Sequence, residues 1–176
     1  MTSKTPILFL GATGYIGGSV LTRLLARPDA DKYEIIALVR SADKARKLET
    51  FGVKTVLGSI KDVHLLESLS ERAHVVFSLV DCDDEDQAHA ILAGLKKRHN
   101  ATGDIPVVVH ASGTGELVYG HDTKGMSVTE TVYDDANIEQ IKSITPKAPH
   151  RPVTLAFVDA DTEGKQSHKC HVLTSS

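Results

Sequence analysis

A set of regularly spaced glycines near the N-terminus offers the clearest chemistry in the sequence. A short apolar stretch, residues 7–10, ends at Gly11, and Gly14 and Gly17 follow at three-residue intervals. Because glycine has no side chain, such a turn leaves backbone N–H groups open at the start of the next helix, where a phosphate can approach them closely. The spacing therefore predicts a phosphate cradle between a strand and a helix. The residues expected to line it are Gly11, Thr13, Gly14, Tyr15, Ile16 and Gly17.

A cradle of this kind needs a strand before it, a helix after it and further strand–helix units beside it. The chain alternates compact apolar stretches with segments of helical periodicity, which is typical of a parallel sheet covered by helices. Strands are expected at 7–10, 35–39, 53–57, 75–79 and 107–109, with helices at 16–25, 44–51, 63–69 and 83–98. The predicted fold class is α/β, a Rossmann-type doubly wound parallel sheet of five to six strands with an incomplete C-terminal part.

This alternation weakens after Ser112. The elements expected beyond it are a loop over 113–132, a helix over 134–143 capped by Asp134 or Asp135, a helix or strand over 153–160 and a last strand over 168–173. We therefore divide the chain into a dinucleotide-binding core, residues 1–112, and an irregular extension, residues 113–176, within one domain.

The end of the second expected strand bears on which dinucleotide would bind. In the predicted fold, a residue about 20 positions after the glycines contacts the adenosine ribose, and an acidic residue there selects NAD. Here Arg40 and Ser41 follow the strand. A guanidinium can hold a ribose 2′-phosphate through two hydrogen bonds, so NADP(H) is favoured over NAD(H). The alternative is that Arg40 is only a solvated charge at the end of a strand.

Hydroxyl side chains after the fifth expected strand are candidates for catalysis. Ser112 and Thr114 would lie at the carboxyl edge of the sheet, where ligands bind in doubly wound folds. A hydroxyl there could donate a hydrogen bond to a substrate carbonyl, whereas an ordinary Ser/Thr turn is the alternative. Tyr119 is the tyrosine nearest in sequence and is a candidate acid/base. We take Ser112, Thr114 and Tyr119 as the candidate catalytic residues.

An acidic segment follows the fourth expected strand. Five of the six residues from Asp81 to Asp86 are acidic, which is one way to hold a divalent ion. They also precede a long helix, where negative charge is favourable and Asp83 or Asp84 could cap the first turn. We favour the helix-start interpretation and predict no metal site. Cys82, among these acids, is expected to have a raised pKa and to be a poor nucleophile.

Composition narrows the classes of partner. The chain has 176 residues, two cysteines and a net charge of −3, which fits one domain in a reducing compartment and disfavours nucleic acid or an anionic membrane as a partner. The apolar stretch at 7–10 is too short for a membrane span. We therefore expect a cytoplasmic protein with no nucleic-acid and no membrane partner. An open sheet edge at a sixth strand would favour a homodimer.

Three stretches together resemble a known family. They are the glycine turn at 11–18, the strand end Leu38-Val39-Arg40, and residues 107–110 continuing into Ala111-Ser112-Gly113-Thr114. These are similar to atypical short-chain dehydrogenases/reductases, in particular NmrA-like and epimerase/dehydratase-like NAD(P)-binding proteins. The resemblance implies an NADPH-dependent oxidoreductase that acts on a small-molecule carbonyl or enone, in a setting such as secondary metabolism.

The sequence also departs from that family. Active extended members use a Tyr-x-x-x-Lys pair, but Tyr119 is followed four residues on by Thr123, and Tyr133 by Asn137. The chain also has roughly half the length usual in that family, so we expect it to correspond to the cofactor-binding half, without the C-terminal substrate-binding region. The second interpretation is therefore a non-catalytic NADP-binding redox sensor or regulatory protein that binds another protein, or a truncated remnant of an enzyme. A cofactor-assisted isomerase or cyclase is a third option, by analogy of fold alone.

Overall fold

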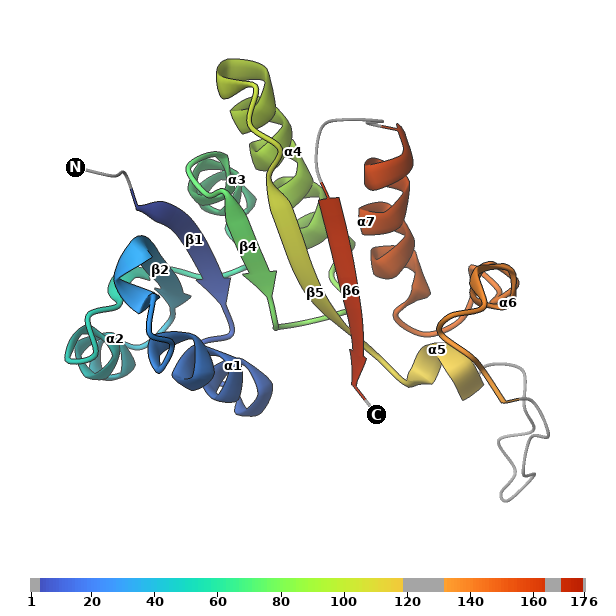
Figure 1. Ribbon diagram of the computed structural model, residues 1–176, viewed down its shortest axis with the longest axis horizontal. Helices are drawn as coiled ribbons and strands as arrows, with labels where there is room; N and C mark the ends of the chain where they lie inside the picture. The colour runs from blue at the N-terminus through green and yellow to red at the C-terminus, as the bar shows by residue number, and fades with distance from the viewer. Residues whose placement is uncertain (1–3, 119–131, 164–168, 176) are drawn as a thin grey trace.

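The computed structural model describes residues 4–118, 132–163 and 169–175. Six strands among these residues form one parallel sheet with the order β3-β2-β1-β4-β5-β6 (Figure 1). The strands are β1 Thr5–Leu10, β2 Tyr33–Val39, β3 Lys54–Leu57, β4 Val75–Ser78, β5 Val107–Gly113 and β6 Lys169–Ser175. This order, in which the chain starts at the centre and reverses direction across the sheet, is that of a doubly wound Rossmann fold, so the predicted fold class is confirmed.

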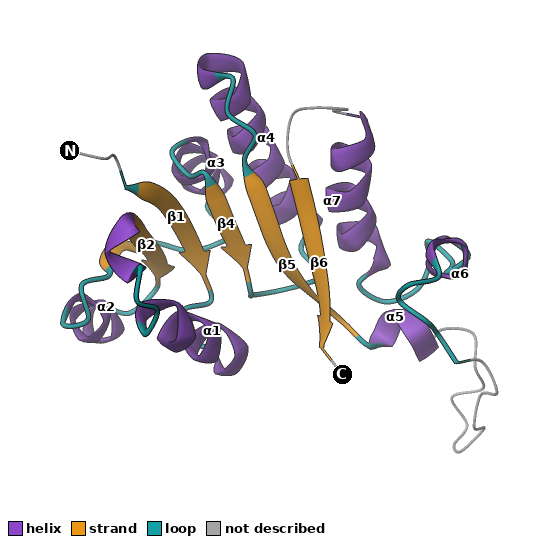
Figure 2. Ribbon diagram, in the orientation of Figure 1, coloured by secondary structure: helices purple, strands orange, loops and turns teal. Residues whose placement is uncertain are grey.

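Helices cover the sheet in two layers (Figure 2). They are α1 Tyr15–Leu25, α2 Ala42–Glu49, α3 Val63–Glu71, α4 Glu85–Thr102, α5 Gly115–Val118, α6 Ile138–Lys142 and α7 Arg151–Glu163, with a short 3₁₀ turn at Ala30–Lys32. Helices α1 and α2 pack on one face of the sheet, and α3, α4 and α7 pack on the other. None of the helices in the described part of the chain is long and apolar enough to cross a membrane.

Strand β1, at the centre of the sheet, is covered on both faces, and its residues do not alternate between apolar and polar. Ile7 and Phe9 pack into the core cluster that contains Leu21 of α1 and Leu48 of α2. Leu8 and Leu10, which point to the opposite face, pack into the cluster that contains Leu66, Ile91 and Phe157 from α3, α4 and α7. Successive side chains of a strand point to opposite faces, so a strand covered on both faces needs apolar residues at every position.

Three expectations about the second half of the chain need correction or completion, besides that of the helix at 134–143. Strand β5 continues through Gly113, because it pairs with β6 along its whole length, so Ser112 lies inside the strand and not after it. A helical turn, α5, occupies 115–118 of the expected loop, and residues 119–131 lie outside the described part. Residues 153–160, which the sequence left open between helix and strand, belong to helix α7.

The expected helix at 134–143 is shorter than predicted. Helix α6 begins at Ile138, and its cap is Asn137, whose side chain accepts a hydrogen bond from the Gln140 N–H at 3.1 Å. Asp134 instead accepts from the Ala136 N–H at 2.9 Å. The Asp134 side chain therefore stabilises a local turn before the helix. Asp side chains favour such turns as well as helix caps, so the same residue type could have predicted either.

Candidate dinucleotide-binding site

Packing alone requires two of the three glycines in the turn between β1 and α1. Gly11 has φ +86°, and a Cβ there would lie 2.1 Å from the carbonyl oxygen of Leu79, the residue after β4. A Cβ at Gly17 would lie 2.1 Å from the carbonyl oxygen of Gly11. Both separations are far below contact distance, so these positions hold the turn, the helix and β4 together whether or not a ligand is bound.

Gly14 is different, because the space above it is open. A Cβ there would meet only the Gly11 carbonyl oxygen, at 3.3 Å, and the backbone has an ordinary φ of −85°. Gly14 is the N-cap of α1, yet no side chain caps the helix. The first helical residues are exposed, Tyr15 by 94% and Ile16 by 43%. A helix N-terminus with free N–H groups and an open approach fits a phosphate, so the residues present suit a bound dinucleotide.

The predicted ribose-binding residues lie at the carboxyl end of β2. Arg40 is exposed, and its guanidinium forms no ion pair or side-chain hydrogen bond with any residue that the structure describes. Ser41 is the N-cap of α2, and its hydroxyl accepts a hydrogen bond from the Lys44 N–H at 3.4 Å. Arg40 is thus an unpaired cation at the position where the fold puts the adenosine ribose.

Two further cations lie near the turn and were not among the predicted site residues. An open groove of about 1070 Å³ runs between α1 and α2, and Thr13, Tyr15, Lys44 and Lys47 line part of it. The lysines are three residues apart on α2, so they share one face of that helix. Arg46 points elsewhere and pairs with Asp43. The helical spacing of Lys44 and Lys47 was visible in the sequence, but only the structure shows that they line the same groove as Thr13.

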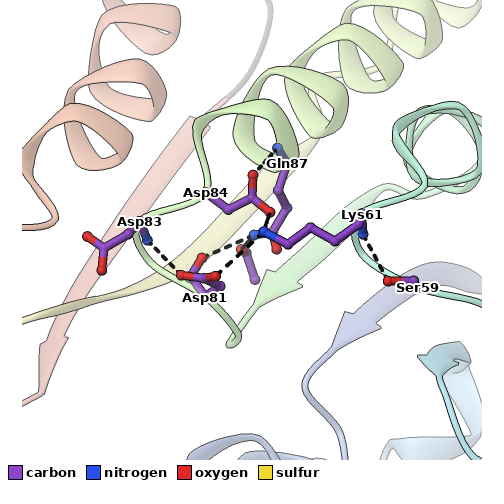
Figure 3. Close-up of polar contacts among 7 residues, drawn as sticks. Ser59, Lys61, Asp81, Asp83, Asp84 and Gln87 are labelled. Atoms are coloured by element: carbon purple, nitrogen blue, oxygen red, sulfur yellow. Dashed lines mark hydrogen bonds and ion pairs between the residues drawn. The ribbon is translucent and has the colours of Figure 1, made fainter.

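The acidic segment after β4 forms the start of α4, as the sequence analysis favoured (Figure 3). Asp84 caps the helix by accepting from the Gln87 N–H at 3.1 Å, and its other oxygen accepts from Lys61 Nζ at 2.7 Å. Burial is the largest single effect on Asp84 and acts to raise its pKa, but the hydrogen bonds from Lys61 and from backbone N–H groups, together with the charge of Lys61, outweigh it and lower the pKa. Burial, and next the charge of Asp83, raise the pKa of the Cys82 thiol, in the expected direction.

The three candidate catalytic residues, at or after the end of β5, do not share one environment. Ser112 is 5% exposed, donates to buried Glu116, and accepts a hydrogen bond from Thr154 Oγ1 at 2.9 Å. Thr114 is exposed in the turn that precedes α5. Tyr119 lies outside the described residues. Of the two candidate hydroxyl groups that the structure describes, that of Thr114 is the exposed one, and the catalytic role of all three residues stays a prediction.

A buried ion pair explains why Ser112 is enclosed. Arg151, the first residue of α7, places Nη1 3.1 Å from Oε2 of Glu116, and both side chains are less than a tenth exposed. Arg151 Nη2 also donates to the Ile141 carbonyl at 3.0 Å. This network joins the end of β5 to α7, so Ser112 contributes to docking the helix.

Comparisons with known proteins agree with this architecture. Residues 3–98 match the model of the NmrA-like family. The chain is 34% identical over 121 residues to the oxidase ucsJ of Acremonium sp., an alignment that covers 68% of this chain and 33% of that protein. The chain therefore spans about a third of the length of this relative.

Two solved structures share the fold. Triphenylmethane reductase of Citrobacter sp., solved as a complex with NADP(H), has a TM-score of 0.57 at 19% identity, over 94% of this chain and 48% of that one. NmrA, described as a negative transcriptional regulator and solved in complex with NADP, has a TM-score of 0.53 at 22% identity, over 68% of this chain and 37% of that one. Because the family model matches more than half of the sequence, this chain belongs to the NmrA-like family.

Proposed function

We propose that this chain binds NADP(H) at the glycine turn and that it belongs to an NADPH-dependent oxidoreductase acting on a small-molecule carbonyl or enone. The observation on which the proposal chiefly rests is the uncapped, exposed N-terminus of α1 beside the unpaired Arg40. When bound, NADPH supplies a hydride, and the protein orients the reactants and excludes competing reactions. A role in secondary metabolism and a cytoplasmic location are parts of the same proposal.

The chain's own residues have distinct tasks in this proposal. The backbone N–H groups at Tyr15 and Ile16 hold the pyrophosphate, with Thr13 adding a hydroxyl, whereas the Gly14 N–H donates to the Gly11 carbonyl at 2.9 Å and shapes the turn. Arg40 and Ser41 hold the ribose 2′-phosphate, and Lys44 and Lys47 add positive charge at the end of the groove. Three cations near one dianion favour NADP(H) over NAD(H), because NAD(H) lacks the phosphate that they would neutralise.

Names and titles of similar proteins support the proposal. The relative in Acremonium sp. is called an oxidase, and a 29% identical protein of Aspergillus novofumigatus is called an oxidoreductase. The Citrobacter reductase was solved with NADP(H). For catalysis, our candidates remain Ser112, Thr114 and Tyr119, and the exposed hydroxyl of Thr114 is the one best placed to donate a hydrogen bond to a carbonyl oxygen.

A fluorescence titration with NADPH and NADH tests the cofactor assignment. Wild-type protein is expected to bind NADPH more tightly than NADH. Arg40→Ala should weaken NADPH binding about 10- to 100-fold, since charge-assisted hydrogen bonds contribute roughly 1.5–3 kcal/mol each, and should leave NADH binding nearly unchanged. The matched control is Lys96→Ala, which removes an exposed cation from α4. Equal affinity for the two cofactors, or an Arg40→Ala variant that binds NADPH normally, would contradict the assignment.

The second candidate function is a non-catalytic NADP-binding redox sensor or regulatory protein. It is favoured by the lack of a Tyr-x-x-x-Lys pair in the sequence and by the structural likeness to NmrA, itself described as a transcriptional regulator. Cofactor binding without NADPH oxidation across a panel of carbonyl compounds, together with a protein partner captured only in the presence of NADPH, would favour this candidate. We also propose a homodimer formed through the edge strand β6, which light scattering would test.

A further inference from the structure

Two adjacent residues meet a third that is distant in sequence at the carboxyl edge of the sheet. Cys82 and Asp83 follow β4, and His150 immediately precedes α7. The Cys82 Sγ lies 3.2 Å from His150 Nδ1, and the Asp83 Oδ1 lies 2.8 Å from the same nitrogen. The three potential ligand atoms all lie within 4.8 Å of one another. We refer to Cys82, Asp83 and His150 as the Cys–Asp–His cluster.

The cluster is poorly satisfied by hydrogen bonds alone, because two groups contact one ring nitrogen. If Nδ1 of His150 carries a hydrogen, it can donate to Asp83, and the Cys82 thiol then has no lone pair on that nitrogen to receive its own hydrogen. If Nδ1 carries none, it can accept from the thiol, but its lone pair then faces the carboxylate of Asp83. A cation bound to the sulfur, the nitrogen and the oxygen would satisfy all three groups at once.

The position of the imidazole is strongly constrained. His150 has φ +67°, in the left-handed region that side-chain-bearing residues seldom adopt. Its ring lies against two glycines of the β5–α5 turn. A Cβ at Gly113 would come within 2.6 Å of the ring, and one at Gly115 within 2.9 Å. The surrounding backbone thus leaves room for this ring and holds it toward Cys82.

Although the acidic segment by itself predicted no metal site, the addition of His150 changes the donor set, and we propose that the Cys–Asp–His cluster binds a thiophilic divalent cation of the zinc class. Thiolate, imidazole and carboxylate are the ligands that zinc prefers, and three protein ligands with a remaining open position are typical of zinc sites that also bind water or a small molecule. One thiolate and one carboxylate balance the charge of a divalent cation, and the thiol proton leaves to solvent on binding.

Two of the three distances between the potential ligand atoms are close to those of zinc coordination, and the third, between Cys82 Sγ and Asp83 Oδ1, is within 4.8 Å. Tetrahedral zinc with bonds of about 2.0–2.3 Å separates its ligand atoms by about 3.3–3.6 Å. The sulfur–nitrogen distance of 3.2 Å is already close to that range, and the nitrogen–oxygen distance of 2.8 Å must open by roughly half an ångström. Asp83 can move by this amount because its side chain is 62% exposed. That exposure also gives the cation a path from solvent.

The test uses the full chain and two probes, Zn²⁺ and Co²⁺. Dialysed protein should retain one equivalent of Zn²⁺, measured by elemental analysis. Co²⁺ should bind at the same site and produce the ultraviolet absorption of a thiolate–cobalt bond together with visible bands of tetrahedral cobalt. Cys82→Ser should abolish the thiolate band, and Asp83→Asn and His150→Gln should each weaken Zn²⁺ binding at least tenfold. The control variants Cys170→Ser and His89→Ala should retain both properties.

Three results would overturn the proposal. They are the absence of stoichiometric Zn²⁺ from the wild-type chain, a thiolate band that survives in Cys82→Ser, or metal affinity that is unchanged in Asp83→Asn. Asp83→Asn alters only an exposed carboxylate, so it keeps the test decisive if another variant fails to fold. None of these readouts involves NADPH, so the outcome is independent of the proposed function.

Discussion

At the scale of single residues, the glycine turn separates structural from ligand-directed positions. Gly11 and Gly17 are required because a side chain would collide with backbone carbonyls at 2.1 Å. Gly14 meets no such obstacle, so its lack of a side chain matters for what approaches from outside. The glycine pattern therefore combines a packing requirement, at Gly11 and Gly17, with a requirement for ligand access, at Gly14. Alanine substitutions can distinguish the two.

This difference predicts opposite effects for two alanine variants. Gly17→Ala should destabilise the fold by about 3 kcal/mol, because the helix and the turn must separate to admit a methyl group. Gly14→Ala should change stability by less than about 1 kcal/mol but weaken NADPH binding at least about tenfold, since its methyl group occupies the phosphate approach. Thermal unfolding and cofactor titration measure the two effects. A Gly14→Ala variant that binds NADPH normally would argue against a phosphate above this residue.

At the scale of elements, the end of β5 and the start of α7 are joined by a buried ion pair. Glu116 lies in α5 and Arg151 opens α7, and each is enclosed with hydroxyls from Ser112 and Thr154. A buried carboxylate that loses its cation is costly, whereas replacing both members of a pair often costs far less. The pair therefore sets the position of α7 more than it adds net stability.

Urea unfolding of single and double variants tests this account. Arg151→Met should lower the free energy of unfolding by about 3–5 kcal/mol, because the Glu116 carboxylate is left buried and unpaired. The double variant Glu116→Gln/Arg151→Met should recover much of that loss. The control Lys142→Met removes the cation of an exposed pair with Glu139 and should cost less than about 1 kcal/mol. A double variant no more stable than Arg151→Met would contradict a charge-based explanation.

At the scale of the whole molecule, a buried histidine links the sheet to the helical layer. His110 on β5 is fully buried, with its Nδ1 3.4 Å from the Ser78 hydroxyl and its ring centroid 4.8 Å from that of Phe157. Burial lowers the pKa of His110 from 6.5 to about 4, against smaller opposing effects of Ser78 and Glu116. The imidazole is therefore neutral in the folded protein at neutral pH.

This histidine predicts a loss of stability in mild acid. The unfolded chain takes up the proton near pH 6.5, whereas the folded chain resists it until about pH 4. Between these two pH values the unfolded state binds more protons than the folded state. The free energy of unfolding therefore falls by up to about 3 kcal/mol as pH drops from about 6.5 toward 4. Above about pH 6.5, His110 makes no pH-dependent contribution to stability. His110→Gln should flatten the unfolding free energy over this range, and the exposed His89→Gln should not. An equally steep pH dependence in His110→Gln would exclude His110 as its source.

The sequence by itself determined the features that depend on short-range patterns. The apolar stretches, the helical periodicities and the glycine spacing predicted the sheet, and the chain order placed Arg40 directly after the second strand, where the structure has it exposed. Each of these follows from residues within about two dozen positions of one another, because turns and strand ends are local structures.

Only the tertiary structure decided what lies against the second half of the sheet. Pairing with β6 extends β5 past Ser112, and burial of Val153 and Phe157 in the core accompanies a helix at α7, where the sequence fitted either state. The crossover from β5 brings His150 back to Cys82 across 68 residues. No local period encodes such contacts, because they depend on the order of strands in the sheet and on which helix packs over which pair of them.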